Sequence, residues 1–98
     1  MPKYLVEFSE EAIADLDSSF EWGCEKWGVA EAATWYFDTR DSLIELLGSF
    51  PYGHPIAQEN DEYEFEARQL ILGRYRVVFN INGRVVTILH IRGPYSGS

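Results

Sequence analysis

Apolar side chains recur at two spacings, and the change from one spacing to the other divides the chain into elements. Residues 3–8 alternate between polar and apolar side chains, which predicts a short strand. Ser9 then precedes two glutamates, as expected for an N-cap followed by acids in the first turn of a helix. Gly28 predicts where this helix ends. Its apolar stripe, at steps of three and four residues, comprises Ile13, Leu16, Phe20, Cys24 and Trp27.

A second helix is predicted from Val29 to Leu47, with Gly48 as its C-terminal cap. Because only Gly28 separates the two helices, they are expected to form an antiparallel helical hairpin. Three alanines near the start of the second helix would allow the helices to approach closely; they are Ala30, Ala32 and Ala33. The predicted buried stripe of this helix is Ala30, Ala33, Phe37, Ile44 and Leu47.

The segment 48–61 is rich in Gly, Pro, Asn and Asp, which predicts a loop. Beyond it the apolar period becomes two, and strands are predicted at 62–72, 74–81 and 84–92. Asn82-Gly83 is typical of a type I′ hairpin turn. Gly73 turns the first of these strands into the second through a bulge or longer loop, because a two-residue turn there would bury Arg68; that register stays open. The prediction is a single α+β domain over residues 1–98, ordered β-α-α-β-β-β, with the helical hairpin packed on a small, mainly antiparallel sheet.

The predicted turn at Asn82-Gly83 also fixes which side chains share a face of the sheet. On the side that packs against the helices, the expected pairs are Ile81 with Arg84, Phe79 with Val86, Val77 with Ile88, and Tyr75 with His90. Arg76 points to the opposite side, across from Leu89. That side also carries Val78 and Val85, so it is partly apolar and is expected to need a cover.

Charge is distributed unevenly along the chain. Sixteen acids against eight bases give a net charge of −8, which argues against broad, non-specific binding to nucleic acid. The last 31 residues, however, contain no acid and five arginines: Arg68, Arg74, Arg76, Arg84 and Arg92. An acidic helical half therefore precedes a basic strand half.

The sequence lacks the residues that several kinds of functional site require. The single cysteine, Cys24, excludes an internal disulfide and is interpreted as a packed apolar side chain. Two isolated histidines offer no metal-ligand spacing, His54 being read as a solvated loop residue and His90 as a hydrogen-bonded core residue. No Gly-rich phosphate loop or Ser-His-Asp order appears, so no metal or cofactor is expected. Without an apolar run of about 18 residues or a signal peptide, a cytoplasmic location with no membrane contact is predicted.

Three stretches together resemble the RelE/ParE superfamily of toxins from type II toxin–antitoxin pairs. They are the opening Glu7-Phe8-Ser9-x-x-Ala12 with Asp15-Leu16, the strand pair from Ala67 to Phe79 with its Gly73-Arg74-Tyr75-Arg76 turn, and the closing strand Val86 to Arg92. The resemblance covers nearly the whole chain. It implies a toxin of a plasmid-stabilisation type of module that is neutralised by a cognate antitoxin, with DNA contacted only indirectly through that antitoxin.

The resemblance implies one of two activities. RelE-like members cut messenger RNA on the ribosome with basic residues, whereas ParE-like members block DNA gyrase and are not nucleases. RelE-like nucleases place lysines on the strand before the Gly turn, where this chain reads Glu62-Tyr63-Glu64-Phe65-Glu66. Because these acids would repel RNA, we favour the gyrase-directed protein binder. A ribonuclease, and a member that has lost toxicity and survives as a regulatory partner, remain the alternatives.

The candidate functional patch comprises Arg68, Arg76 and Arg92, with Tyr95 beside it. By position, Arg76 matches the arginine after the aromatic of the third strand, Arg92 the basic residue that ends the last strand, and Tyr95 a C-terminal aromatic of the superfamily. Three guanidinium groups on adjacent strands repel one another unless an anion or carboxylate lies among them. Alternatively, Arg68 forms only a surface ion pair with Glu64 or Glu66. The three acids at 62–66 are read as a solvated strand edge, or as a docking patch for basic residues of an antitoxin.

Overall fold

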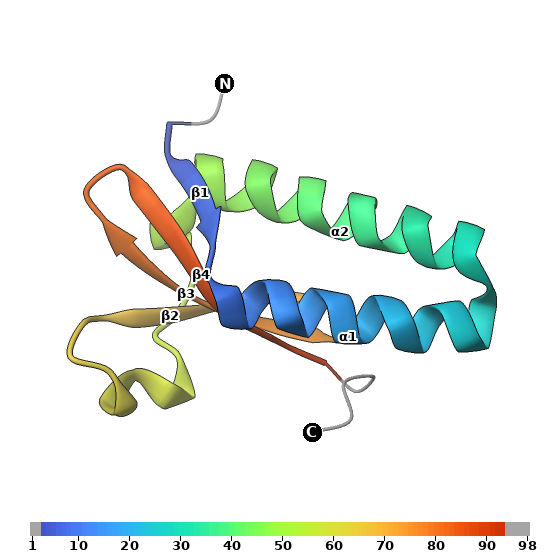
Figure 1. The fold of residues 1–98 in the computed structure, drawn as a ribbon. Helices are drawn as coiled ribbons and strands as arrows, with labels where there is room; N and C mark the ends of the chain where they lie inside the picture. The colour runs from blue at the N-terminus through green and yellow to red at the C-terminus, as the bar shows by residue number, and fades with distance from the viewer. Residues whose placement is uncertain (1–2, 94–98) are drawn as a thin grey trace.

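The computed structural model describes residues 3–93 and confirms the α+β fold in the predicted order. Strand β1 (Leu5–Phe8) leads into helix α1 (Glu10–Trp27) and helix α2 (Val29–Ser49). Two short 3₁₀ helices follow, η1 (Pro51–Gly53) and η2 (Gln58–Glu62), and then strands β2 (Ala67–Leu72), β3 (Tyr75–Asn82) and β4 (Val85–Arg92). Figure 1 shows the two helices side by side as an antiparallel hairpin on one face of the sheet.

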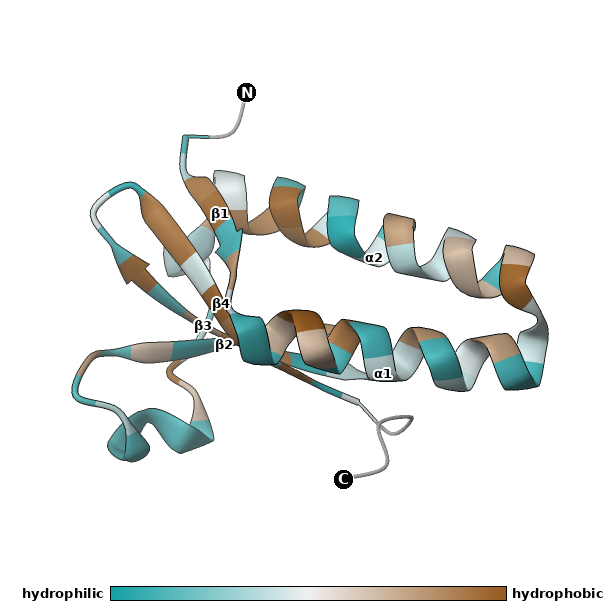
Figure 2. Ribbon diagram, in the orientation of Figure 1, coloured by the Kyte–Doolittle hydropathy of each residue, from teal (hydrophilic) through white to brown (hydrophobic). Residues whose placement is uncertain are grey.

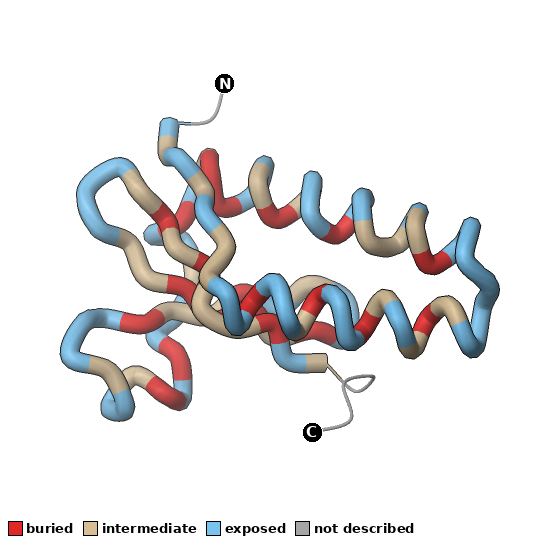
Figure 3. The backbone as a smooth tube through the Cα atoms, in the orientation of Figure 1, coloured by how far each residue is buried: buried red, intermediate tan, exposed pale blue. Residues whose placement is uncertain are grey.

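The sheet has the strand order β1-β4-β3-β2. Strand β1 runs parallel to β4, and the remaining neighbours are antiparallel. The main core lies between this sheet and the hairpin, where the largest buried side chains include Leu16, Leu43, Phe79 and Ile88. Figures 2 and 3 show the same arrangement, with apolar and buried positions on the inner faces of the helices and along the central strands.

The ends of the helices agree with the sequence except at one cap. The Ser9 side chain accepts a hydrogen bond from the Ala12 N–H, and Gly28 lies between the two helices with a φ of 93°. The predicted cap at Gly48 is wrong, because α2 continues to Ser49 and its C-cap is Phe50. Instead, Gly48 is buried and its carbonyl accepts hydrogen bonds from the N–H groups of Lys3 and Tyr4, which ties the start of β1 to the end of α2.

The buried stripes of both helices are rotated from the predicted ones. Ile13 and Phe37, expected in the core, are 45% and 55% exposed. Small side chains take the inner positions instead, because the two helices approach closely: a Cβ atom at Gly23 would lie 3.3 Å from the Cβ of Ala32. The observed buried positions are Ala12, Leu16, Ser19 and Gly23 in α1, and Ala32, Thr39, Leu43, Leu47 and Gly48 in α2.

The β3–β4 turn is displaced by one residue from the prediction. Asn82 pairs with Val85, so the two turn residues are Gly83 and Arg84. Gly83 has a φ of 62° while Arg84 does not have a positive φ, which rules out type I′ and fits the type II′ turn with glycine first. The register is consequently shifted by two, and Phe79 pairs with Ile88 rather than with Val86. Because side chains alternate with period two, a shift of two keeps Phe79, Val86 and Ile88 on their predicted face. Beyond Phe79 the register shifts by one more residue, so His90 does not pair with Tyr75.

The β2–β3 connection also differs from the prediction. It is a two-residue turn, Gly73-Arg74, and it places Arg68 directly opposite Phe79, on the face that carries the helices. Strand β2 begins only at Ala67, so the acids at 62–66 lie outside the strand and the solvated strand edge predicted for them is wrong. Residues 51–66 instead wrap around the β2 edge, where Ile56 forms an isolated bridge to Arg68.

The second face of the sheet is covered by the chain itself. A small apolar cluster there joins Val78 and Ala67 to Ala57, with Tyr63 and Leu89 packed against it. The sequence predicted that this face needs a cover. The segment that contains η2 covers it at Val78.

Candidate functional site

Arg76 and Arg92 lie directly opposite each other on β3 and β4, on the sheet face away from the helices. This confirms the predicted orientation of Arg76, although its partner on β4 is Arg92 rather than Leu89. Two adjacent guanidinium groups repel each other in the absence of a counter-charge. A carboxylate between them is therefore expected on electrostatic grounds.

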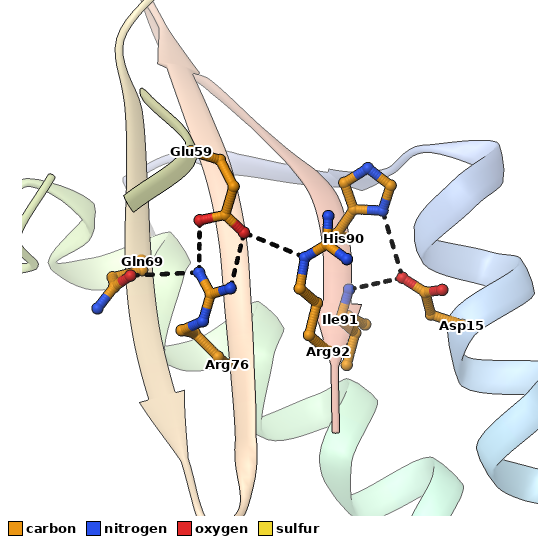
Figure 4. Close-up of polar contacts among 7 residues, drawn as sticks. All are labelled: Asp15, Glu59, Gln69, Arg76, His90, Ile91 and Arg92. Atoms are coloured by element: carbon orange, nitrogen blue, oxygen red, sulfur yellow. Dashed lines mark hydrogen bonds and ion pairs between the residues drawn. The ribbon is translucent and has the colours of Figure 1, made fainter. Parts of the chain in front are cut away.

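Glu59 of η2 supplies that carboxylate (Figure 4). Its Oε1 and Oε2 accept hydrogen bonds from Nη1 and Nη2 of Arg76 at 2.6 and 2.7 Å, the two-pronged geometry that makes arginine–carboxylate pairs strong. Oε2 also accepts a hydrogen bond from Nε of Arg92 at 3.1 Å. Gln69 accepts a further, longer bond from Arg76 at 3.3 Å. We call Arg76, Glu59 and Arg92 the arginine clamp.

The arginine clamp is partly shielded from solvent. Glu59 is only 9% exposed, while the side chains of Arg76 and Arg92 are 24% and 50% exposed. The hydrogen bonds from Arg76 lower the pKa of the Glu59 carboxyl to about 2, against the opposing effect of burial and with a further contribution from the charge of Arg92. The same pairing raises the pKa of Arg76. Glu59 is thus a fixed negative charge at neutral pH.

Backbone hydrogen bonds hold η2 in place over the sheet. The Ala57 N–H donates to the Ala67 carbonyl at 2.8 Å, and the Gln69 N–H donates to the Pro55 carbonyl at 2.9 Å. The Asn60 side chain accepts a hydrogen bond from the Ala67 N–H at 2.8 Å. Because these bonds flank Glu59 on both sides, its carboxylate is positioned by the backbone and not only by the two arginines.

Arg68 does not join the other two arginines. Its Nε donates to Glu66 at 2.9 Å and its Nη1 donates to the His54 carbonyl at 2.7 Å, on the opposite sheet face from Arg76. The alternative expectation, an ion pair with Glu64 or Glu66, is confirmed for Glu66. The grouping of Arg68 with Arg76 and Arg92 is wrong, because the two-residue turn at Gly73-Arg74 reverses the face that Arg68 occupies. Tyr95 lies outside the described residues.

Both histidines differ from their predicted surroundings. His90 pairs with Val78 rather than Tyr75 because β4 contains an irregularity between Ile88 and His90. Its ring is partly exposed, with Nδ1 3.5 Å from a carboxylate oxygen of Asp15. His54 is half-buried, with its ring against Phe79, and burial together with the charge of Arg68 lowers its pKa.

The irregularity in β4 is held by α1. At the bulge the Ile91 N–H donates to Oδ2 of Asp15 at 2.8 Å (Figure 4), and the Ser9 hydroxyl donates to the Leu89 carbonyl at 2.9 Å. Bulges leave ladder groups unpaired, and these two side chains pair with groups at the bulge. The opening of α1 thus fixes where the end of β4, and with it Arg92, is placed.

We expect Asp15→Ala to lower the free energy of unfolding by about 1–2 kcal/mol, because it leaves the Ile91 N–H without an acceptor. Asp15→Asn keeps a side-chain oxygen at the same position and should lose less than half as much. Urea unfolding followed by tryptophan fluorescence measures both values. Equal losses in the two variants would show that the charge of Asp15, rather than this hydrogen bond, is what stabilises the junction.

Sequence reasoning missed Glu59, which it placed in the loop. Neither its neighbours nor its spacing indicate a role, and the only available signal was indirect: arginines on adjacent strands require a nearby anion. Within residues 3–93, no group of three or more His, Cys, Asp or Glu side chains has the arrangement of a metal site. No helix in this part of the chain is long and apolar enough to cross a membrane.

Comparison with known proteins finds a matching family model and a solved structure of similar fold. A family model described as the ParE toxin of the type II toxin–antitoxin system, parDE, matches residues 6–93. Among solved structures, one from the chromosomal ParDE TA system of P. aeruginosa superimposes with a TM-score of 0.75 at 19% identity, covering 93% of this chain and 96% of that chain. No curated protein matches the sequence.

Proposed function

This chain belongs to the ParE toxin family of type II toxin–antitoxin systems, and from that premise we propose that it acts by binding a protein target, DNA gyrase, and is neutralised by a cognate antitoxin. Proteins of this fold can have either of two activities, protein binding or RNA cleavage. A ribonuclease must hold and polarise a phosphate, whereas a protein binder needs only a complementary surface. The arrangement of charge on the sheet supports the protein binder.

The arginine clamp is the observation that carries the proposal. RNA cleavage requires positive charge on the phosphate in transit, together with a general base and a general acid. In this chain the two sheet arginines best placed for that task already bind the Glu59 carboxylate, with Arg76 engaged through both of its terminal nitrogens. A phosphate approaching them would meet a buried negative charge. This favours a protein target over RNA.

The surroundings of the clamp support the same choice. His90, a potential acid or base, has a carboxylate oxygen of Asp15 3.5 Å from its Nδ1. The end of η2 and the segment that leads from it to β2 add Glu62, Glu64 and Glu66, all exposed. Carboxylates in and next to η2, the element that carries Glu59, lower the local potential and weaken phosphate binding.

The helical hairpin offers apolar surface that a protein partner would cover. Phe37 and Ile13 are 55% and 45% exposed, and a groove of about 210 Å³ between α1 and α2 is lined by Phe20, Ala33 and Tyr36 among others. Exposed aromatic side chains of this kind are enriched at the centres of protein interfaces. The hairpin therefore supports binding to an antitoxin or a target protein, and it needs no catalytic group to do so.

We expect induced expression of the chain alone to arrest bacterial growth, and co-expression with the product of the neighbouring gene to restore it. The co-purified complex should bury at least the roughly 1,200 Å² of a standard interface. Normal growth without the partner would favour the alternative of a member that has lost toxicity. A stable monomer whose neighbouring gene encodes no binding partner would contradict the proposed module. The target itself is tested by comparing gyrase supercoiling with translation-coupled cleavage of messenger RNA.

A further inference from the structure

Three segments meet at the end of the sheet where α2 stops. The Lys3 and Tyr4 N–H groups donate to the Gly48 carbonyl, and the Leu5 N–H donates to the Arg84 carbonyl at 2.7 Å. The start of β1, the end of α2 and the β3–β4 turn are therefore neighbours, as Figure 1 also shows. Lys3, Tyr4, Gly83 and Arg84 line an open notch of about 480 Å³ between them.

Aromatic rings and cations continue from this notch across the sheet. The ring of Tyr4 contacts that of Tyr52 edge to face, with centroids 6.3 Å apart, and the Arg68 guanidinium lies 5.3 Å from the Tyr52 ring centroid. We define the basic–aromatic strip as Lys3, Arg84, Tyr4, Tyr52 and Arg68. It runs from the β1 side of the sheet to β2, a width of about 14 Å at the usual strand spacing of about 4.8 Å.

The strip differs in charge from the rest of the molecule. Ten of the sixteen acids lie in α1 and α2, which carry only two bases. The strip contains three cations, one of which, Arg68, is paired with Glu66 at 2.9 Å. A strongly acidic protein thus has one end where an anionic ligand meets positive charge, while its helical hairpin repels such a ligand.

Exposed aromatic surface between the cations favours an anionic ligand that also has flat rings. Tyr52 is 56% exposed, with Arg68 at one side and Lys3 and Arg84 beyond Tyr4. Positive groups that track a backbone, with rings on which bases stack, are the features of single-strand nucleic-acid sites. We propose that the basic–aromatic strip binds a short stretch of single-stranded nucleic acid, with phosphates against Lys3 and Arg84 and a base on Tyr52. This goes beyond the proposed function, because binding a protein target does not require it.

The same geometry sets the strength of binding. Two phosphates held by Lys3 and Arg84 release few counterions, so the logarithm of the binding constant should fall with the logarithm of salt concentration with a slope of about −1.4. The acidic hairpin limits the site to a few nucleotides. Binding is therefore expected at low salt and lost near physiological salt, in line with the net charge of −8.

Fluorescence anisotropy with a labelled 12-residue oligothymidylate and the full chain tests the proposal at about 20 mM salt. Wild-type protein should bind, the double variant Lys3→Ala/Arg84→Ala should bind at least about tenfold more weakly, and Tyr52→Leu should lose about five- to tenfold through lost stacking. Lys26→Ala, which removes a cation at the far end of α1, is the matched control and should bind as the wild type does.

A second arm replaces the oligonucleotide with labelled oligoglutamate of equal length. The proposal expects it to bind much more weakly and with no dependence on Tyr52. Equal binding of the two ligands, unaffected by Tyr52→Leu, would show a general anion patch and overturn the nucleic-acid assignment. Absence of binding by the wild-type chain at 20 mM salt, with circular dichroism showing that it is folded, would overturn the site altogether.

Discussion

Glu59→Gln is expected to lower the free energy of unfolding at pH 7 by about 3 kcal/mol. The estimate follows from the carboxyl pKa, which falls from 4.5 to about 2 in the folded chain, at about 1.4 kcal/mol per unit. The physical cause is the arginine clamp: glutamine retains one acceptor but no charge, so Arg76 and Arg92 then face each other across a neutral group. Because Glu59 is only 9% exposed, solvent replaces little of this interaction.

The pH dependence of this loss distinguishes the clamp from a packing defect. A carboxyl group with a lowered folded-state pKa stabilises the protein above its unfolded pKa, and that stabilisation is lost as the pH falls through the folded value. The difference between wild type and Glu59→Gln should therefore be full at pH 7 and shrink between pH 4.5 and pH 2. Urea unfolding at pH 7 and pH 3 measures it away from the pI near 4.6, where solubility is lowest.

Glu62→Gln is the matched control, since Glu62 lies in the same 3₁₀ helix but is exposed. Its effect should stay within about 0.5 kcal/mol at both pH values. If Glu59→Gln were no more destabilising than Glu62→Gln at pH 7, the clamp would not be an organising contact of the fold. The arginines would then be available to a ligand, and the case against phosphate binding would fail.

Gly93→Ala is expected to destabilise the domain by about 2–3 kcal/mol, a large effect for the addition of one methyl group. A Cβ atom at this position would lie 2.2 Å from a ring carbon of Tyr75, well inside van der Waals contact. Tyr75 is 6% exposed and its ring packs against Trp35 with ring centroids 5.4 Å apart, so the ring has little room to move. Overpacking of this kind typically costs about 1–3 kcal/mol.

A double-mutant cycle isolates this contact. In a Tyr75→Leu background the ring that meets the new methyl group is absent, so Gly93→Ala should cost less than about 1 kcal/mol there. Thermal unfolding of the four proteins gives the interaction term. Equal costs of Gly93→Ala in both backgrounds would show that the loss comes from the backbone of residue 93 rather than from the Tyr75 ring.

The start of α1, the α1–α2 junction and the faces of the core residues of β3 and β4 near their turn were predictable from the sequence because local chemistry specifies them. Ser9 and Gly28 act on their own backbone neighbourhood, and both lie where the sequence placed them. The register of β3 against β4 was wrong by two residues near the turn, since Asn82 closes the ladder, and by three beyond the bulge at Phe79. The assignment of Phe79 and Ile88 to the core was unaffected, because only an odd shift exchanges the faces.

The candidate site was less predictable because it depends on one turn and one distant residue. Arg68 changes face with the length of the connection at Gly73, and burial alone argued against the two-residue turn that is present. The objection failed because the aliphatic stem of Arg68 can lie over the sheet while its guanidinium reaches the carbonyl of His54 and the Tyr52 ring. Glu59 reaches Arg76 across 17 positions of sequence, a distance over which no local pattern operates.

The choice between a gyrase binder and a ribonuclease is tested by two assays of the purified chain. We expect inhibition of DNA gyrase supercoiling, reversed by the antitoxin, and no translation-coupled cleavage of messenger RNA. Arg92→Gln serves as the probe variant, because it leaves the Arg76–Glu59 pair intact and should keep the fold and the gyrase effect. Messenger RNA cleavage by the wild-type chain that is abolished in Arg92→Gln or Arg76→Ala, with supercoiling unaffected, would contradict the account and assign the chain to the ribonucleases.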